Sequence, residues 1–214
     1  MKITDQSYEI IALDSDWFKE SIYKICKGYC ECYNKPMPKT FEDMYNYVKK
    51  WRKHGSPLEH GHMSVEFTTN LGVANELVRH RHTAYSQQST RYCNYSLDRF
   101  DNGLTFILDS SVKDSDQLLD IWLKGRKADE KEYLTRLSLG QTPEQARGCL
   151  PKDLLTKILV TANLREWHSI FELRTSVRAH YQMRELMIPL LMDVQEKIPC
   201  IFDDIVVEEN YNVF

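Results

Sequence analysis

The chain has 214 residues, of which 42% are hydrophobic and 28% are charged, with a formal net charge of −3. This composition is ordinary for a soluble globular protein, and the length predicts a single domain over residues 1–214. The slight acidic excess argues against general nucleic-acid binding, which usually needs a basic surface. No apolar run approaches the roughly 20 residues that span a bilayer, and the first residues lack a signal-peptide core, so we expect a cytoplasmic protein.

The N-terminal part is predicted to form one strand and two helices. Residues 7–13 are apolar and β-branched enough for a first strand. Asp14 or Ser15 is expected to cap the first helix, and a second helix is expected over residues 40–54. Residues 54–60 contain Gly, Ser and Pro, which predicts a turn-forming segment after the second helix.

The middle of the chain begins with a clear strand pattern. Residues 62–69 alternate apolar and polar side chains, which is typical of a half-buried strand. Asn70 is expected to cap a short helix that leads to Arg79, and the polar residues after it are expected to form a loop. Residues 104–108 are predicted to form the next strand, and the acidic, serine-rich residues 109–120 a surface loop.

The rest of the chain is predicted to be mainly helical. Apolar residues recur at helical spacing over 118–139, and Gly140 is expected to end that helix before a short one that starts at 142–144 and ends at 147–151. A further helical pattern covers 177–198. Another apolar stripe is formed by Leu154, Leu155, Ile158, Leu159 and Ala162. The sequence therefore predicts an α+β fold with a mixed or antiparallel sheet flanked by helices and a helical C-terminal third.

Residues 79–92 contain three arginines and two histidines and no carboxylate. Guanidinium groups donate paired hydrogen bonds to phosphate or carboxylate oxygens, so this cluster indicates an anion site. The hydroxyl and amide side chains of residues 86–90 could hydrogen-bond the polar edge of a ring. The composition suits a phosphorylated, ring-containing ligand. The alternative is that the cations only stabilise the negative end of the preceding helix.

The order of these residues carries a family resemblance. Arg79-His80-Arg81, followed by seven residues and Ser89, resembles the signature of the flavin-dependent thymidylate synthases. Further agreement spreads over residues 54–184. The resemblance implies an enzyme that methylates dUMP at C5 to dTMP. In that family methylenetetrahydrofolate supplies the carbon, FAD reduced by NADPH supplies the reducing equivalents, and the active sites are shared between the subunits of a homotetramer.

The resemblance also implies two sets of binding residues. FAD would be bound by His54, Ser56, Arg79, His80, Arg81, Gln87, Asn163, Leu164, Arg165 and Ser169. The substrate dUMP would be bound by Glu76, Leu77, Val78, Arg79, Gln87, Gln88, Ser89, Thr90, Arg91, Arg147 and Arg174. Glu59 and His60 would border the flavin, and Glu76 and Arg79 would approach the nucleotide from another subunit.

Arg174 is the expected catalytic residue. A fixed cation beside the uracil would favour the form of the ring with negative charge on N3 and its carbonyl oxygens, and so raise electron density at C5. The alternative is an arginine paired with Glu172 or Glu185 on a helix surface.

The chain departs from the family pattern at two positions. Glu76 stands where members often have Gln, and Ser169 stands where His or Asn is expected, with His168 one residue earlier. No Gly-x-Gly-x-x-Gly motif follows a predicted strand, so we expect a flavin site that is not of the Rossmann type.

Two other functions are compatible with parts of the sequence. Cys149, close to Arg147, could be the nucleophile of the other type of thymidylate synthase, which needs no flavin. Alternatively, the basic and aromatic residues of 79–92 could bind RNA as charged and stacking groups. The cysteines show no spacing that completes a tetrahedral metal site, so we expect reduced thiols and no metal.

Overall fold

A computed structural model describes residues 1–12 and 16–207 of the chain. It contains two compact units. The first is formed by Met1–Ser7, Phe67–Arg79 and Tyr85–Leu159, and the second by Tyr8–Glu66, His80–Ala84 and the described residues from Val160 on. The single domain over residues 1–214 stays a prediction. Residue 13 at the end of the predicted first strand, and the predicted caps Asp14 and Ser15, lie outside the described residues.

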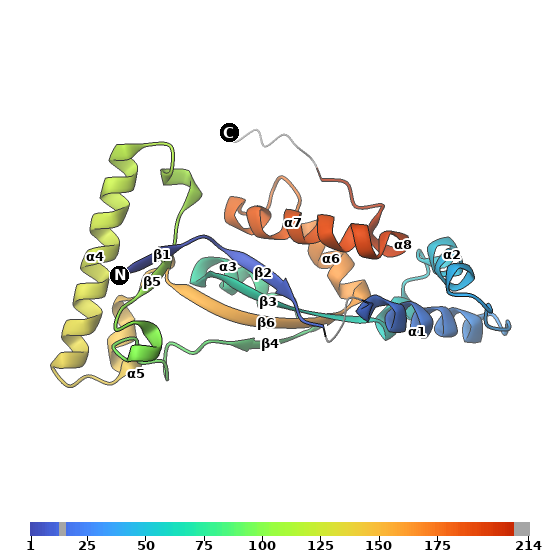
Figure 1. Cartoon of the computed structure of the whole chain (residues 1–214), viewed down its shortest axis with the longest axis horizontal. Coiled ribbons are helices and arrows are strands. Elements are labelled where there is room, and N and C mark those ends of the chain that lie inside the picture. Colours follow the sequence, from blue (N-terminus) through green and yellow to red (C-terminus); the bar gives the residue numbers. More distant parts are fainter. Residues whose placement is uncertain (13–15, 208–214) are drawn as a thin grey trace. The chain divides into compact units, whose positions relative to one another are not determined.

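The strands form two sheets (Figure 1). β1 (Lys2–Thr4) pairs in parallel with β5 (Thr105–Ile107), with Ile3 opposite Phe106. The larger sheet has the order β2-β3-β6-β4, formed by β2 (Ser7–Ile10), β3 (His62–Asn70), β6 (Leu155–Asn163) and β4 (Thr83–Gln87). With the helices described below, these sheets confirm the predicted α+β class.

Two local predictions were wrong. The stripe at 154–162 belongs to a strand, because Thr156, Ile158, Val160 and Ala162 are buried in strict alternation along β6. That alternation and the β-branched side chains favour an extended backbone over the helical spacing that the leucines also satisfy. The polar residues after Arg79 were expected to form a loop, but Thr83–Gln87 form β4 at the edge of the larger sheet.

The first unit packs its helices around an aromatic core. α4 (Asp116–Ser138) runs without a break through Gly125, and Gly140 follows it with a φ of 93° that favours glycine. The predicted loop at 109–120 is shorter than expected, because it holds η3 (Ser110–Val112) and the first turns of α4. α3 (Leu71–Leu77), η2 (Asp98–Phe100), α5 (Pro143–Ala146) and η4 (Arg147–Cys149) complete the unit. The buried core consists of Tyr95, Leu104, Phe106, Trp122, Tyr133, Ala146 and Leu154.

The second unit is mainly helical. α1 (Trp17–Cys32) packs beside α2 (Phe41–Trp51) (Figure 1). Thr40 caps the N-terminus of α2, with 3.1 Å from Asp43 N to Thr40 Oγ1. η1 (Ser56–His60) lies between α2 and β3. α6 (Leu164–Arg174), α7 (Tyr181–Lys197) and α8 (Pro199–Phe202) pack together. Trp167 is fully buried and donates from Nε1 to the Met63 carbonyl at 2.9 Å, which holds α6 in place.

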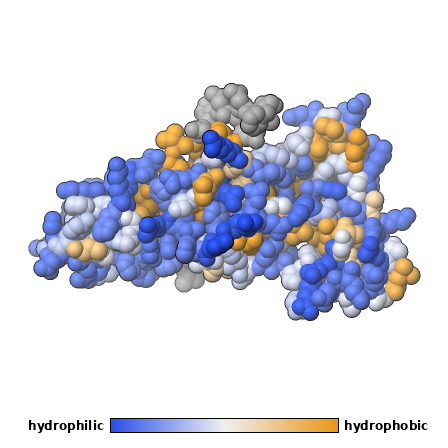
Figure 2. Space-filling model, turned by 180° about the vertical axis from the view of Figure 1, so that it is seen from behind, coloured by the Kyte–Doolittle hydropathy of each residue, from blue (hydrophilic) through white to orange (hydrophobic). Residues whose placement is uncertain are grey.

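The surface is largely polar. Hydrophilic residues dominate the face in Figure 2, and hydrophobic residues appear there in separate groups. Among the described residues, no helix has both the length and the apolar character needed to cross a bilayer.

Candidate functional site

His54 begins the turn-forming segment at 54–60 and is held by side chains on both sides. Tyr33 Oη lies 3.1 Å from His54 Nδ1, and Ser56 Oγ lies 3.3 Å from His54 Nε2. The segment is anchored by Pro57 and Leu58, which are buried. His54 and Ser56, both expected to bind the flavin, are therefore brought together on an ordered turn of the second unit.

The predicted residues 163–165 lie at the start of α6. Asn163 Oδ1 accepts from Glu166 N at 2.8 Å, so its side chain caps the helix. Leu164 is fully buried. Arg165 is exposed and donates from Nη1 to Glu59 Oε1 at 2.6 Å. Only Arg165 thus presents a charged side chain at the surface of this segment.

Two hollows adjoin Arg165 and Ser169 in the second unit. The first has a volume of about 410 Å³ and is lined by Glu59, His82, Asn163, Arg165, Glu166 and Ser169. The second has a volume of about 310 Å³ and is lined by Arg52, Lys53, Gly55, Leu58, Arg165, His168, Ser169, Ile201 and Asp204. Ser169, the departure from the family pattern, therefore faces both.

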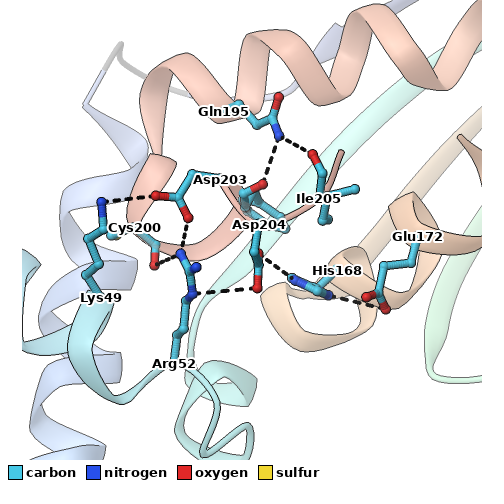
Figure 3. Close-up of polar contacts among 10 residues, drawn as sticks. Lys49, Arg52, His168, Glu172, Gln195, Cys200, Asp203, Asp204 and Ile205 are labelled. Carbon is cyan, nitrogen blue, oxygen red and sulfur yellow. Dashed lines mark hydrogen bonds and ion pairs between the residues drawn. The ribbon is translucent and has the colours of Figure 1, made fainter. Parts of the chain in front are cut away.

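His168 belongs to a network of charges, and Arg52, His168 and Asp204 of this network also line the second hollow (Figure 3). Its Nε2 lies 3.1 Å from Asp204 Oδ1 and its Nδ1 lies 3.5 Å from Glu172 Oε2. Arg52 in turn pairs with Asp203 and lies 3.6 Å from Asp204 Oδ2. Both nitrogens of the His168 ring therefore lie within 3.5 Å of carboxylate oxygens, and His168 lines the second hollow beside Ser169.

Arg174 is oriented by a histidine of the basic cluster. Its Nε donates to His80 Nε2 at 2.9 Å, and His80 Nδ1 lies 3.7 Å from Glu166 Oε1. His80 is only 8% exposed. Burial, reinforced by the guanidinium of Arg174, lowers the pKa of His80 from 6.5 to about 4. The imidazole is therefore neutral at pH 7, and because Nε2 accepts, its proton is on Nδ1.

The other predicted nucleotide residues lie in the first unit, where hydrogen bonds fix β4. Tyr85 Oη donates to the Leu77 carbonyl at 2.6 Å, and Gln87 Nε2 donates to Thr156 Oγ1 at 3.3 Å. The segment beyond β4 turns sharply, with Arg91 N donating to Ser89 Oγ at 3.2 Å.

The predicted arginines differ in their partners. Arg91 Nε pairs with Glu144 Oε1 at 2.9 Å, and both side chains are half exposed. Arg79, Arg81 and Arg147 are exposed and form no ion pair with another described residue. Three of the predicted cations are thus available to an anionic ligand.

A third hollow, of about 450 Å³, lies in the first unit and is called here the β4 hollow. Its lining consists of Leu71, Asn75, Gln87, Gln88, Ser89, Thr90, Leu150 and Lys152. Four consecutive residues expected to bind dUMP are therefore gathered in one concave site. Arg147 does not line it.

These features agree with the comparison with known families. Residues 13–200 match the family described as thymidylate synthase complementing protein. The chain belongs to this family. Its members include the flavin-dependent thymidylate synthase of Pyrococcus abyssi, which is 34% identical over 146 residues, or 67% of this chain and 59% of that protein. That of Mycolicibacterium vanbaalenii is 30% identical over 192 residues, covering 81% of this chain and 74% of the relative.

The chain spans less than two thirds of the length of the archaeal relatives that it matches. A solved structure of the family's fold is PolB from Streptomyces cacaoi, a UMP/dUMP methylase bound with 5-Br dUMP. It is 18% identical with a TM-score of 0.76, and the match covers 95% of this chain and 96% of PolB. The family resemblance and the fold class are both confirmed.

Several residues that line these hollows were not predicted as ligand contacts. His82 and Glu166 line the larger hollow of the second unit, and Asn75 and Lys152 line the β4 hollow. His82 lies within the basic cluster, so its place in the sequence was a usable signal. Asn75 and Lys152 follow no motif, and only the folded chain brings them to the predicted residues.

Proposed function

We propose that the chain is an FAD-dependent thymidylate synthase that methylates dUMP to dTMP. Methylenetetrahydrofolate supplies the carbon and NADPH supplies the reducing equivalents. The enzyme works in the cytoplasm as a homotetramer of single-domain chains with shared active sites. The single observation that carries this proposal is the hydrogen bond between Arg174 and neutral His80, in a chain whose residues 13–200 match the family.

The hydrogen bond suits catalysis because it orients a cation without cancelling its charge. A carboxylate in place of His80 would neutralise Arg174, whereas a neutral imidazole only accepts one of its hydrogen bonds. Beside the uracil, the guanidinium favours negative charge on the carbonyl oxygens and N3, which activates C5 toward the carbon donor.

The residues of the second unit fit a cofactor with a diphosphate. Arg81 is exposed and forms no ion pair with a described residue. Arg165, His82 and the Asn163 amide line the larger hollow together with Glu166 and with Glu59, which pairs with Arg165. Cationic and amide donors suit phosphate oxygens and the polar edge of a flavin ring. Bound there with His54 and Ser56 nearby in the same unit, FAD would supply the hydride that the methyl group requires.

Overall, one methylene group passes from the folate to C5 of dUMP, and two hydrogens, supplied by NADPH and one proton, complete the two products. The C5–H of dUMP becomes C5–CH₃, methylenetetrahydrofolate becomes tetrahydrofolate, and NADPH with one proton becomes NADP⁺. The part of this chain is to bind and orient both ligands and to stabilise the charge on the uracil ring.

The alternative with a cysteine nucleophile is disfavoured by the state of Cys149. Burial raises the pKa of the Cys149 thiol, and its Sγ donates to the Ala146 carbonyl at 3.3 Å. A nucleophilic cysteine needs a lowered pKa, because the thiolate is the reactive form.

The experiment is to purify the protein and test it for bound FAD and for conversion of dUMP. A yellow protein that releases FAD on denaturation and forms dTMP only with both NADPH and methylenetetrahydrofolate supports the proposal. A colourless protein that forms dTMP without NADPH contradicts it. Sedimentation of the active species tests the assembly, since an active monomer is incompatible with shared sites.

A further inference from the structure

Lys152 occupies a wall of the β4 hollow opposite residues that are expected to bind the nucleotide. Gln87, Gln88, Ser89 and Thr90 come from β4 and the turn after it, and Lys152 comes from the segment that precedes β6. All of these residues belong to the first unit. The family resemblance assigns no role to this lysine.

The backbone around Lys152 is held on both sides. Its carbonyl accepts from Gly72 N at 3.2 Å, and the Leu154 carbonyl accepts from Leu71 N at 3.1 Å, so the segment is tied to the start of α3. Ile107 N donates to the carbonyl of the intervening Asp153 at 2.9 Å. The position of Lys152 is therefore fixed by the fold even though its side chain is exposed.

The neighbouring acid does not neutralise this lysine. The carboxylate of Asp153 accepts from Trp122 Nε1 at 2.9 Å and pairs with Arg126, both on α4. Asp153 is therefore committed to the core side of the segment, whereas Lys152 lines the hollow.

Charge in the β4 hollow is unbalanced. Lys152 is the one charged residue of its lining, and it forms no ion pair with another described residue. Arg91, the nearest predicted cation in sequence to Gln87–Thr90, pairs with Glu144. The remaining polar groups of the lining are amides and hydroxyls, which donate hydrogen bonds to an anion without adding charge.

We propose that Lys152 binds the phosphate of the nucleotide substrate, as a point charge beside the hydrogen-bonding groups of Gln87–Thr90. This inference rests on the proposed function. The ligand class is a nucleoside monophosphate, whose phosphate dianion an ammonium group binds well.

The test combines one substitution with one change in the ligand. Lys152→Gln removes the charge, and Lys131→Gln, at an exposed lysine of α4 without an ion pair to a described residue, is the matched control. Calorimetry gives the affinity of each protein for dUMP and for deoxyuridine, which lacks the phosphate. We expect Lys152→Gln to weaken dUMP binding about tenfold, as for a hydrogen bond to a charged group, and to leave deoxyuridine binding unchanged.

Each outcome decides a different point. Equal weakening of dUMP and deoxyuridine would mean that Lys152 only shapes the hollow, and no weakening would mean that it does not contact the ligand; either result overturns the inference. An unaltered protein that binds neither dUMP nor FAD overturns the proposed function, and the inference falls with it. Normal flavin binding and turnover with unchanged dUMP affinity in Lys152→Gln overturns only the inference.

Discussion

Cations are used in opposite ways at two places in this molecule. The charged residues labelled around His168 in Figure 3 are paired, since Arg52 meets Asp203 and Asp204, and His168 meets Asp204 and Glu172. In the β4 hollow no acid contributes to the lining, and Lys152 forms no ion pair with another described residue. A balanced network stabilises the fold that surrounds it, whereas an unbalanced cation gains a partner only when an anion binds. We therefore expect a substitution within the network to change stability, and a substitution of Lys152 to change ligand binding.

Arg174 is an intermediate case whose substitution should have the largest effect. Its Nε donates to His80, whose pKa is lowered to about 4, so this contact orients the guanidinium without itself cancelling the charge. We expect Arg174→Ala to remain folded and to retain flavin, with NADPH still reducing it, while dTMP formation falls about 100-fold or more, as for loss of a group that stabilises transition-state charge. Single-turnover assays measure this step.

The control is Arg136→Ala, which removes only an exposed pair with Glu132 on α4. Its activity should equal that of the unaltered protein. Near-normal dTMP formation by Arg174→Ala would show that Arg174 is a surface arginine without a catalytic role.

The balanced network should act on stability. Arg52 is 19% exposed, and Arg52→Met leaves Asp204 with one fewer cation and Asp203 with Lys49 alone. We expect a loss of about 1–3 kcal/mol in the free energy of unfolding, as for a partly buried charged hydrogen bond. Its neighbour Lys53 is exposed and forms no ion pair with a described residue, so Lys53→Met should change stability by less than about 0.5 kcal/mol. Chemical denaturation measures both, and equal effects would remove the distinction between the two kinds of cation.

His80 should make stability depend on pH in a defined window. Its pKa is lowered from 6.5 to about 4 in the folded chain, so the unfolded chain binds the proton first as the pH falls. The contribution of His80 is therefore complete above pH 6.5 and is lost between pH 6.5 and pH 4, with a slope of at most about 1.4 kcal/mol per pH unit. His80→Gln, which keeps an acceptor for Arg174, should have a smaller slope in this window. Denaturant titrations at several pH values measure both proteins. Identical slopes for the unaltered protein and His80→Gln would refute the assignment of His80 as a neutral partner of Arg174.

Ser89 should show the smallest effect. Its hydroxyl lines the β4 hollow and accepts from Arg91 N, and no described base holds it as a nucleophile would need. We expect Ser89→Ala to weaken dUMP binding about three- to tenfold, the value of one neutral hydrogen bond, with turnover retained. Loss of all turnover at unchanged dUMP affinity would instead assign Ser89 a chemical role.

Local sequence signals predicted the secondary structure correctly where a pattern allowed only one interpretation. The alternation at 62–69, the cap at Asn70 and the glycine after α4 all appear as expected. β6 was misread because its leucines satisfy helical spacing while its buried residues alternate, and the choice between them depends on the neighbouring strands. β1 has three residues, which is too short for a periodic signal.

The sequence predicted residues of the candidate site but not the contacts between them. Motif order indicated His80 and Arg174, yet their hydrogen bond joins positions 94 apart in the sequence, and the lowered pKa of His80 results from burial that only the fold creates. The place of Lys152 in the β4 hollow could not be predicted for the same reason. In the sequence, a single lysine after a proline indicates no binding site. Only the fold brings residues of α3 and β4 beside it.

The hydrogen bond from Tyr85 to the Leu77 carbonyl also determines the register of β4. Side chains alternate between the two faces of a strand, so a slip of one residue would turn Tyr85 and Gln87 to the opposite face. An edge strand is prone to such slips because it has a neighbour on only one side. The phenol joins Tyr85 to Leu77 across the first basic residues of the cluster, and the segment between them cannot lengthen or shorten without straining that bond. Insertions or deletions within residues 78–84 should therefore misalign the nucleotide residues even where every one of them is retained.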